Sequence, residues 1–304
     1  MKFTPKLPPQ DINVSKRNHL KDFFVLLSGF FGVIIIVLLI LVALADYLVS
    51  YIPIDVEKQL FQSMHQVAPK ASDPESERGK VEQYLHKLVV RLNNGWPEVS
   101  KQLTGKSAER QKFTIAVIHM NAPNAFILPG GHIGVTHGLL RLVKSENGLA
   151  MVIAHEMAHQ YKRHPLRTLG RGIVVLLAMS TLTSSDDSWW VGSLSSNAAK
   201  IGLLKFSRDQ EREADKIGLA LVTQLYGHRK GATEFFESIS NMAKLTPGYL
   251  AFLNSHPATH ERLKALKDKS QDTTHKLSSL PKHVIRFGKI NFETHKDTLE
   301  MLKR

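Results

Sequence analysis

Two histidines and a glutamate within LAMVIAHEMAHQYKRH, residues 149–164, have the types and spacing of a metal site. His155 and His159 are four residues apart in a segment expected to be helical, so their imidazoles project from one face, one turn apart. Two imidazoles placed in this way can bind one zinc ion, and Glu156 beside them can transfer protons. The alternative is a chance match on an amphipathic helix, so the motif needs support from elsewhere in the chain.

A carboxylate-rich stretch further along, SRDQEREADKIGLA over residues 207–220, offers the third ligand that catalytic zinc sites usually take from the protein. Glu211 and Asp215 are four residues apart and face the same way on a helix. A ligand at Glu211 leaves Asp215 free to accept a hydrogen bond from a ligating imidazole, which would fix the tautomer of that histidine. Glu213 is expected to point away into solvent. The alternative is a charged helix face stabilised by pairs four residues apart.

The elements that must position these groups are mostly helices. Apolar residues recur at intervals of three and four over residues 74–94, which predicts an amphipathic helix. Alternation in FTIAVIH, residues 113–119, predicts a strand. Ser145 is a plausible N-cap for the helix that carries the two histidines. A long helix, expected from about Ile201 to Gly227, carries the carboxylates.

Two apolar stretches differ in length. Residues 23–45, FFVLLSGFFGVIIIVLLILVALA, contain no charge, and a helix of that length crosses about 30 Å of hydrocarbon. This stretch therefore predicts a transmembrane anchor. Residues 173–182, IVVLLAMSTL, are too short to span a bilayer. We expect them to form a buried helix or a wall of the cleft, in preference to a segment that dips into the membrane.

The charges around the anchor predict its orientation. Five Lys and Arg residues precede it, while acidic residues follow it closely at Asp46, Asp55 and Glu57. The positive-inside rule then puts the N-terminus in the cytoplasm and the remaining chain across the membrane. A cleaved signal peptide is the competing interpretation, because Ala43-Leu44-Ala45 resembles a cleavage site. The length of the apolar run favours an uncleaved anchor, and both interpretations export the catalytic part.

The composition excludes several other classes of protein. Cysteine is absent, so any metal site must use histidine and carboxylate ligands. The net charge is +13, from 40 Lys and Arg against 27 Asp and Glu. No run of five basic residues and no nucleic-acid motif accompanies this charge, which favours a diffusely basic surface. We therefore expect no nucleic-acid partner.

Four motifs occur in a characteristic order: NAFILPGG, HEMAH, EREAD and SHPATHERL. On these motifs the chain resembles, over roughly residues 75–268, the HtpX, CAAX prenyl protease and Oma-type family of membrane-associated zinc metallopeptidases, which are gluzincins. Its single membrane span resembles the exported branch of that family. The resemblance implies that His155, His159 and Glu211 bind one Zn²⁺ per chain and that Glu156 is the general base. It also implies a helix-rich fold with a small sheet edge above the zinc.

The resemblance suggests two further site residues. It puts His256, in SHP, near the cleft, where this side chain is our candidate donor to the tetrahedral oxyanion. The alternative is a histidine that caps the following helix. Asn124, in NAF, is a candidate to hold the substrate backbone, and the strand after it offers an edge for an extended peptide. The other histidines near these motifs are expected to be ordinary polar or core residues: His119, His132, His137 and His164.

The sequence therefore predicts an α+β, mainly α fold: a zincin-like metallopeptidase domain with a small sheet over an HExxH helix, preceded by one transmembrane helix. The predicted segments are a cytoplasmic tail (1–22), the anchor (23–45), a juxtamembrane connector (46–73), the zinc metallopeptidase domain (74–270) and a basic C-terminal extension (271–304). The expected function is a zinc-dependent endopeptidase that acts on unfolded or misassembled polypeptides of the membrane and envelope. It would work from the inner membrane, with the catalytic domain on the periplasmic side. The alternative is a chaperone-like or peptide-binding module that retains the fold with little hydrolysis.

Overall fold

The computed structural model describes residues 18–60, 72–183, 206–243, 250–256, 260–270 and 274–290. Much of the predicted tail (1–17), part of the connector (61–71) and the end of the C-terminal extension (291–304) lie outside these residues. The elements are α1 (His19–Val49), α2 (Ile54–Leu60), α3 (Glu77–Asn94), α4 (Trp96–Thr104), β1 (Thr114–Ile118), β2 (Ala125–Leu128), β3 (His132–Thr136), α5 (His137–Leu142), α6 (Glu146–Tyr161), α7 (His164–Thr183), α9 (Arg208–Tyr226), α10 (Glu234–Ala243), α11 (Leu250–Ser255), α12 (His260–Ser270) and α13 (Lys282–Gly288).

Helix α6 is the centre of the domain, and every one of its residues is buried. Ser145 caps it as predicted, because the Ser145 side chain accepts a hydrogen bond from the Gly148 N–H at 3.1 Å. Helix α9 packs along α6, while α3, α7 and α10 also contact it. A helix surrounded in this way can hold polar side chains only if they find partners inside the protein.

A three-stranded sheet covers another side of α6, with β2 packed against the helix. The strand order is β1-β3-β2, where β1 runs parallel to β3 and β2 runs antiparallel to it. The predicted strand over 113–119 is thus β1, at an edge of the sheet. The mainly helical architecture with this small sheet confirms the predicted fold class.

Two helix boundaries illustrate how local sequence sets the elements. The helix predicted over 74–94 is α3, which begins at Glu77 because Ser76 is extended and its side chain accepts from the Gly79 N–H. The helix expected from about Ile201 begins at Arg208 instead. Ser207 and Gln210 form a capping box, which fixes the N-terminus of α9 at that point.

The C-terminal segment 274–290, which the sequence left without a structural assignment, packs onto the domain. Helix α13 contacts α3 and α5, and the side chains of Val284 and Phe287 are part of the core. The backbone of Ser278 pairs with the start of α6, since the Glu146 N–H donates to the Ser278 carbonyl at 2.9 Å. This described part of the extension therefore helps to hold the central helix.

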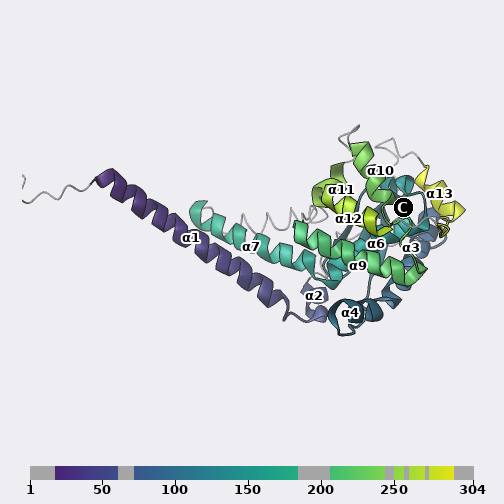
Figure 1. Cartoon of the computed structure of the whole chain (residues 1–304), viewed down its shortest axis with the longest axis horizontal. Coiled ribbons are helices and arrows are strands. Elements are labelled where there is room, and N and C mark those ends of the chain that lie inside the picture. Colours follow the sequence, from purple (N-terminus) through teal and green to yellow (C-terminus); the bar gives the residue numbers. More distant parts are fainter. Residues whose placement is uncertain are drawn as a thin grey trace, which may run out of the picture.

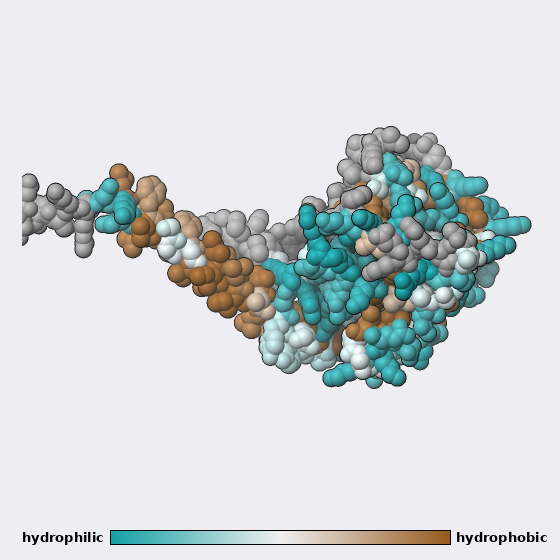
Figure 2. All heavy atoms as spheres, viewed as in Figure 1, coloured by the Kyte–Doolittle hydropathy of each residue, from teal (hydrophilic) through white to brown (hydrophobic). Residues whose placement is uncertain are grey.

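Helix α1 extends away from the domain (Figure 1) and contains the predicted anchor at 23–45. Within the described part of the chain it is the one helix long and apolar enough to cross a membrane, with a mean hydropathy of 3.2 over its most apolar window. Figure 2 shows α1 as a mainly hydrophobic surface, with a few near-neutral positions, beyond the mainly hydrophilic domain.

Helix α7 also leaves the domain, lying beside α1 (Figure 1). It contains the apolar stretch 173–182, for which we expected a place inside the domain or along the cleft. Helix α7 packs on α1, and Ile173 at the start of the stretch is 40% exposed, whereas the side chains of residues 175–182 lie outside the described residues.

Candidate active site

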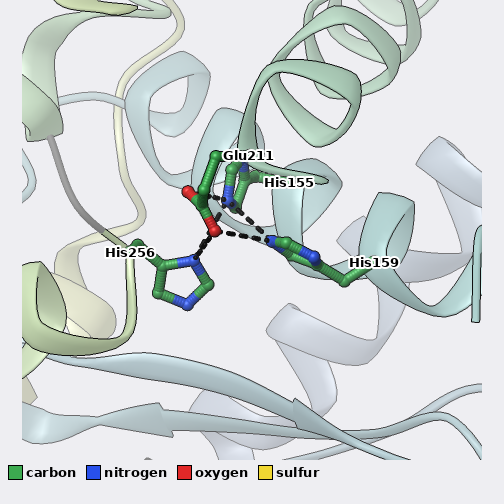
Figure 3. A group of neighbouring side chains, drawn as sticks. All are labelled: His155, His159, Glu211 and His256. Carbon is green, nitrogen blue, oxygen red and sulfur yellow. Dashed lines mark hydrogen bonds and ion pairs between the residues drawn. The ribbon is translucent and has the colours of Figure 1, made fainter. Parts of the chain in front are cut away.

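The two histidines of HEMAH lie on one face of α6, fully buried. Their Nε2 atoms are 3.1 Å apart and point into the same space (Figure 3). The spacing of four residues on a straight helix is sufficient to bring the two rings together.

Glu211 reaches the same space from α9 and is also fully buried. One carboxylate oxygen, Oε1, lies 3.4 Å from His159 Nε2, and the other, Oε2, lies 3.5 Å from His155 Nε2. Gly218 allows this close approach of the two helices, because a methyl group at that position would lie 3.2 Å from the His155 backbone nitrogen. The α6–α9 contact therefore sets the distance from the histidines to the carboxylate.

These three side chains fit a zinc ion. Zinc–nitrogen bonds of about 2.0–2.1 Å at tetrahedral angles place neighbouring ligand atoms roughly 3.4 Å apart. The distances among His155, His159 and Glu211 are 3.1, 3.4 and 3.5 Å. Two imidazoles and a carboxylate are also a common donor set for catalytic zinc.

His256 belongs to the same cluster, in which one candidate ligand atom from each of the four residues lies within 4.8 Å of the others. Its Nδ1 is 3.0 Å from Glu211 Oε1 and 3.3 Å from His155 Nε2. Its Nε2 faces the other way and lies 3.4 Å from Glu156 Oε1. His256 thus contacts both the candidate ligands and the candidate base. The structure does not support the alternative of a side chain that only caps the following helix.

Glu156 is buried with little polar compensation. Its side chain is fully buried, and neither carboxylate oxygen has a hydrogen-bond partner among the described residues. A buried carboxyl without donors costs free energy, so its retention needs another reason. Its Oε1 lies beside the cluster, 3.4 Å from His256 Nε2.

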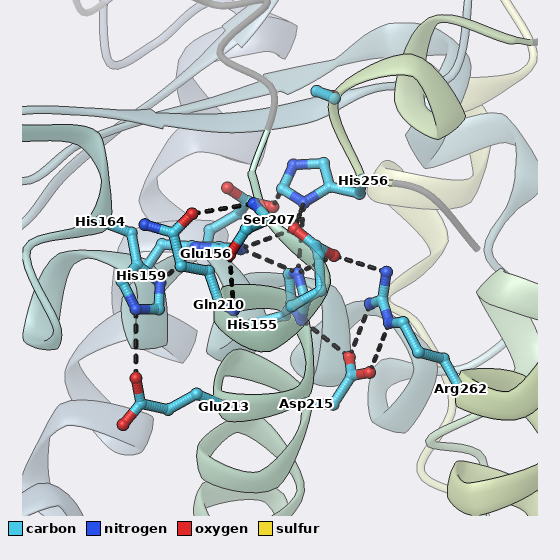
Figure 4. A network of polar contacts seen from close by, with 12 residues as sticks. His155, Glu156, His159, His164, Ser207, Gln210, Glu213, Asp215, His256 and Arg262 are labelled. Atoms are coloured by element: carbon cyan, nitrogen blue, oxygen red, sulfur yellow. Dashed lines mark hydrogen bonds and ion pairs between the residues drawn. The ribbon is translucent and has the colours of Figure 1, made fainter. Parts of the chain in front are cut away.

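Asp215 and Arg262 lie next to the cluster, beside His155 (Figure 4). Asp215 Oδ1 lies 3.0 Å from His155 Nδ1, the contact that the four-residue spacing from Glu211 suggested. The Arg262 guanidinium donates to both oxygens of Asp215, at 2.7 and 2.9 Å, and also pairs with Glu211 Oε2. Arg262 lies within SHPATHERL but was not singled out from the sequence, although its place in the same motif as His256 was an available signal.

His164 is closer to the site than expected. Its Nδ1 lies 2.9 Å from His159 Nδ1, and its Nε2 lies 3.2 Å from Glu213 Oε2. Glu213 also pairs with Lys162 at 2.7 Å, and its side chain is 39% exposed, so it meets solvent as expected while contacting two neighbours. Phe206 stacks on the His159 ring with centroids 3.9 Å apart. These contacts hold the His159 ring from the side away from Glu211.

The remaining candidates contact the sheet and residues beside it. Asn124 precedes β2, where its backbone N–H donates to Thr136 Oγ1 at 2.8 Å and its carbonyl accepts from the Thr136 N–H. The Asn124 side chain is buried, and its Oδ1 has no hydrogen-bond partner within the described part of the chain. His132 and His137 serve the fold, since His132 Nδ1 contacts Thr114 Oγ1 and His137 Nε2 contacts the Phe287 carbonyl.

The electrostatics of the cluster favour a cation. Burial raises the pKa of the Glu156 carboxyl and lowers the pKa of His159 well below its ordinary value. Burial also opposes the charged form of His155, but hydrogen bonds to Asp215 and Glu211 outweigh it and raise the pKa of that imidazole to about 10. Positive charge beside these carboxylates is therefore stabilised, which is the condition that a metal ion satisfies. Such concentrated, opposing shifts are typical of functional sites.

Comparison with known proteins identifies the family. Residues 96–270 match Peptidase family M48, and the chain belongs to this family. The family predicted from the four motifs is thus confirmed. The mitochondrial metalloendopeptidase OMA1 of Schizosaccharomyces pombe is 37% identical over 162 residues, which make up 52% of this chain and 46% of that protein.

A second group of relatives is bacterial. The beta-barrel assembly-enhancing protease of Escherichia coli K12 is 26% identical over 208 residues, covering 64% of this chain and 39% of that protein. The chain therefore spans less than half the length of these curated relatives.

Proposed function

We propose that this protein is a zinc-dependent endopeptidase, with one zinc ion per chain held by His155, His159 and Glu211. The observation that carries the proposal is the buried convergence of these three donors at separations of 3.1 to 3.5 Å. Membership of Peptidase family M48 and the similarity to proteins named as metalloendopeptidases support it.

The chemistry divides between the metal and the side chains. A bound zinc ion would supply a Lewis acid that lowers the pKa of a water molecule and polarises the scissile carbonyl. Glu156 accepts the proton of the attacking water and passes it to the leaving amine. Burial raises the pKa of this carboxyl, which brings its proton affinity closer to the neutral range in which such transfers are efficient.

In the proposed reaction, three further residues assist the zinc ligands and the general base. Asp215 orients His155 through the Nδ1 contact, so that Nε2 is presented to the metal. His256 donates from Nε2 to the oxyanion, a role supported by its position 3.4 Å from Glu156. Asn124 contacts the substrate backbone beside the edge strand β2, and its buried Oδ1, unpaired among the described residues, supports that assignment.

We further propose that the substrates are unfolded or misassembled membrane and envelope proteins. The N-terminus would lie in the cytoplasm, α1 in the inner membrane and the catalytic domain on the periplasmic side. The basic residues before α1 and the acidic residues after it support this orientation. The relative named for enhancing beta-barrel assembly supports the substrate class. A reporter that is active only outside the cytoplasm, fused after Arg304, should be active, and an inactive reporter would contradict the orientation.

One variant distinguishes the endopeptidase from the alternative function, a chaperone-like or peptide-binding module. Glu156→Gln should retain zinc and lose hydrolysis of casein, an unfolded substrate, by about 10²-fold or more. Glu98→Gln, at an exposed position on α4, is the matched control and should hydrolyse casein at the wild-type rate. Equal physiological activity of the wild type and Glu156→Gln would favour the binding module instead.

A further inference from the structure

Helix α7 is held against α1 at the point where the predicted membrane span ends. Arg171 Nε lies 2.9 and 3.0 Å from the two carboxylate oxygens of Asp46, the first charged residue after the span. One residue earlier, a methyl group on Gly170 would lie 3.8 Å from the Ala45 Cβ and 3.9 Å from Val49 Cγ2. These distances are ordinary van der Waals contacts, so the two helices are packed against each other here, and α7 then runs on beside the apolar part of α1 (Figure 1).

The burial pattern of α1 indicates how far this contact extends. One stripe on α1 is buried or half-buried while most of the neighbouring apolar side chains are exposed. Its members are three or four residues apart, the spacing of one helix face: Ile34, Leu38, Val42, Ala45 and Val49. Nearer the N-terminus no such stripe is present, and Leu26 and Phe30 are 74% and 61% exposed. Because α7 packs on α1, this stripe marks the face that α7 covers, from Val49 back to Ile34.

Ile34 is the central residue of the predicted span 23–45. The helix that packs on α1 therefore reaches the depth at which the middle of a bilayer would lie. The length of α7 agrees, since the thirteen residues from Arg171 to Thr183 extend about 18 Å, somewhat more than half of the roughly 30 Å hydrocarbon core. The sequence from Gly172 to Ser185 contains no charged residue. A helix packed along a transmembrane helix at this depth has lipid as its surroundings.

The chain after α7 returns to the domain. Phe206 stacks on His159, and its backbone N–H donates to the Ser255 carbonyl at 3.2 Å. His164 and Phe206 therefore both lie at the candidate active site. Helix α7 begins at this site, and its part beyond Arg171 is too short to span the bilayer.

We propose that residues 172–183 of α7 insert halfway into the bilayer beside α1, as a second membrane-embedded helix in contact with lipid acyl chains. The Asp46–Arg171 pair then lies at the hydrocarbon boundary on the side of the catalytic domain. This inference goes beyond the proposed function but rests on its claim that α1 crosses a membrane. A half-inserted helix differs from the single-pass anchor predicted from the sequence.

The junction between the helices is built to keep this arrangement fixed. Arg163, two residues beyond α6 and with a φ of 55°, donates to the carbonyls of Val49, the last residue of α1, and of Ile52. Its guanidinium also pairs with Glu57 on α2, which is 1% exposed and accepts from Gln160 Nε2 at 2.9 Å. The helix that carries the two candidate zinc-binding histidines is thus tied directly to the end of the membrane helix.

The arrangement limits where cleavage can occur. Seven residues, or about 10 Å of helix, separate Arg171 at the boundary from His164, whose ring contacts His159. The candidate zinc site therefore lies at the level of the lipid headgroups. The substrates it fits are polypeptides whose scissile bond lies within this distance of the membrane surface.

Cysteine scanning tests the inference directly, because the chain has no native cysteine. Each residue from 173 to 182 is replaced in turn by cysteine in the full chain, labelled with a nitroxide and reconstituted in phosphatidylcholine–phosphatidylglycerol vesicles. Collision with oxygen, which partitions into lipid, is compared with collision with a water-soluble nickel chelate. Val33→Cys on α1 is the reference for the membrane interior, and Ile285→Cys on α13, 41% exposed, is the reference for water.

The expected result is that oxygen collision exceeds nickel collision along α7, and that the ratio of the two rates increases from residue 173 towards 182. Both collision rates should fall at positions where the label faces α1. If the α7 labels behave like Ile285→Cys while Val33→Cys is deep, the inference is overturned and the anchor stands. If Val33→Cys also behaves as a residue in water, both the inference and the membrane anchoring in the proposed function are overturned.

Discussion

Asp215→Asn tests how the site orients its histidine. The carboxylate accepts at both oxygens, from His155 Nδ1 at 3.0 Å and from Arg262 at 2.7 and 2.9 Å. Asparagine has nearly the same shape but only one acceptor oxygen, so its NH₂ group must face a donor. With Asp215 only 7% exposed, one such mismatch costs about 1–3 kcal/mol.

The same change should weaken zinc binding, because the tautomer and ring orientation of His155 are no longer fixed. Loss of a hydrogen-bonded partner of this kind typically costs 10–100-fold in metal affinity, which corresponds to about 1.4–2.7 kcal/mol. The affinity is measured on the full chain in detergent by competition with a chromophoric zinc chelator, and stability is measured by thermal unfolding in the same detergent.

Asp209→Asn is the matched control, because it makes the same substitution in the first turn of the same helix. The Asp209 side chain is 87% exposed, and its pair with Arg212 is a surface ion pair worth less than about 1 kcal/mol. Zinc affinity in this control should equal that of the wild type. An Asp215→Asn protein that binds zinc within about twofold of the wild type would refute the orienting role.

Three further predictions concern stability, the oxyanion and the metal. Burial opposes ionisation of Glu146, but hydrogen bonds from Tyr84, Tyr226 and Arg91 outweigh it and hold the pKa of this carboxyl below 4.5. Glu146→Gln should therefore cost about 1.5–3 kcal/mol in urea unfolding at pH 7, and the difference should vanish as the pH falls below 4.5 through the lowered pKa. His256→Gln should lower kcat on casein by about 10²–10³-fold with unchanged zinc content, whereas loss of zinc would assign this histidine to the metal instead. Removal of zinc by a chelator should lower the melting temperature by roughly 5–10 °C, because zinc at a hundred times its Kd contributes about 2.7 kcal/mol, and an unchanged melting temperature would contradict a site bound in the folded state.

Local signals were sufficient for much of the fold and site. The apolar run of α1, the Ser145 cap of α6 and the periodicity of α3 each depend on residues close together in the chain. The histidine pair is likewise determined by a spacing of four on one helix, and Glu211 was found because catalytic zinc needs a third ligand.

Other features depend on contacts between distant residues, which periodicity does not record. Arg262 pairs with Asp215 across 47 positions, and α13 packs on α3 and α5 although its sequence is short and basic. The start of α9 differs from the predicted one, because the capping box of Ser207 and Gln210 begins the helix at Arg208 although apolar residues precede it from Ile201. Residues 173–182 carry no signal in their own sequence for the packing of α7 on α1, because an apolar pattern does not name the partner that covers it.

The most direct test of the zinc site is the metal content of the purified full chain after dialysis against metal-free buffer. The wild type and Asp209→Asn should each retain about one zinc per chain, whereas Glu211→Gln, two residues away on the same helix, should retain little. A wild type without zinc, or a Glu211→Gln protein that holds as much zinc as the wild type, would contradict the proposed site.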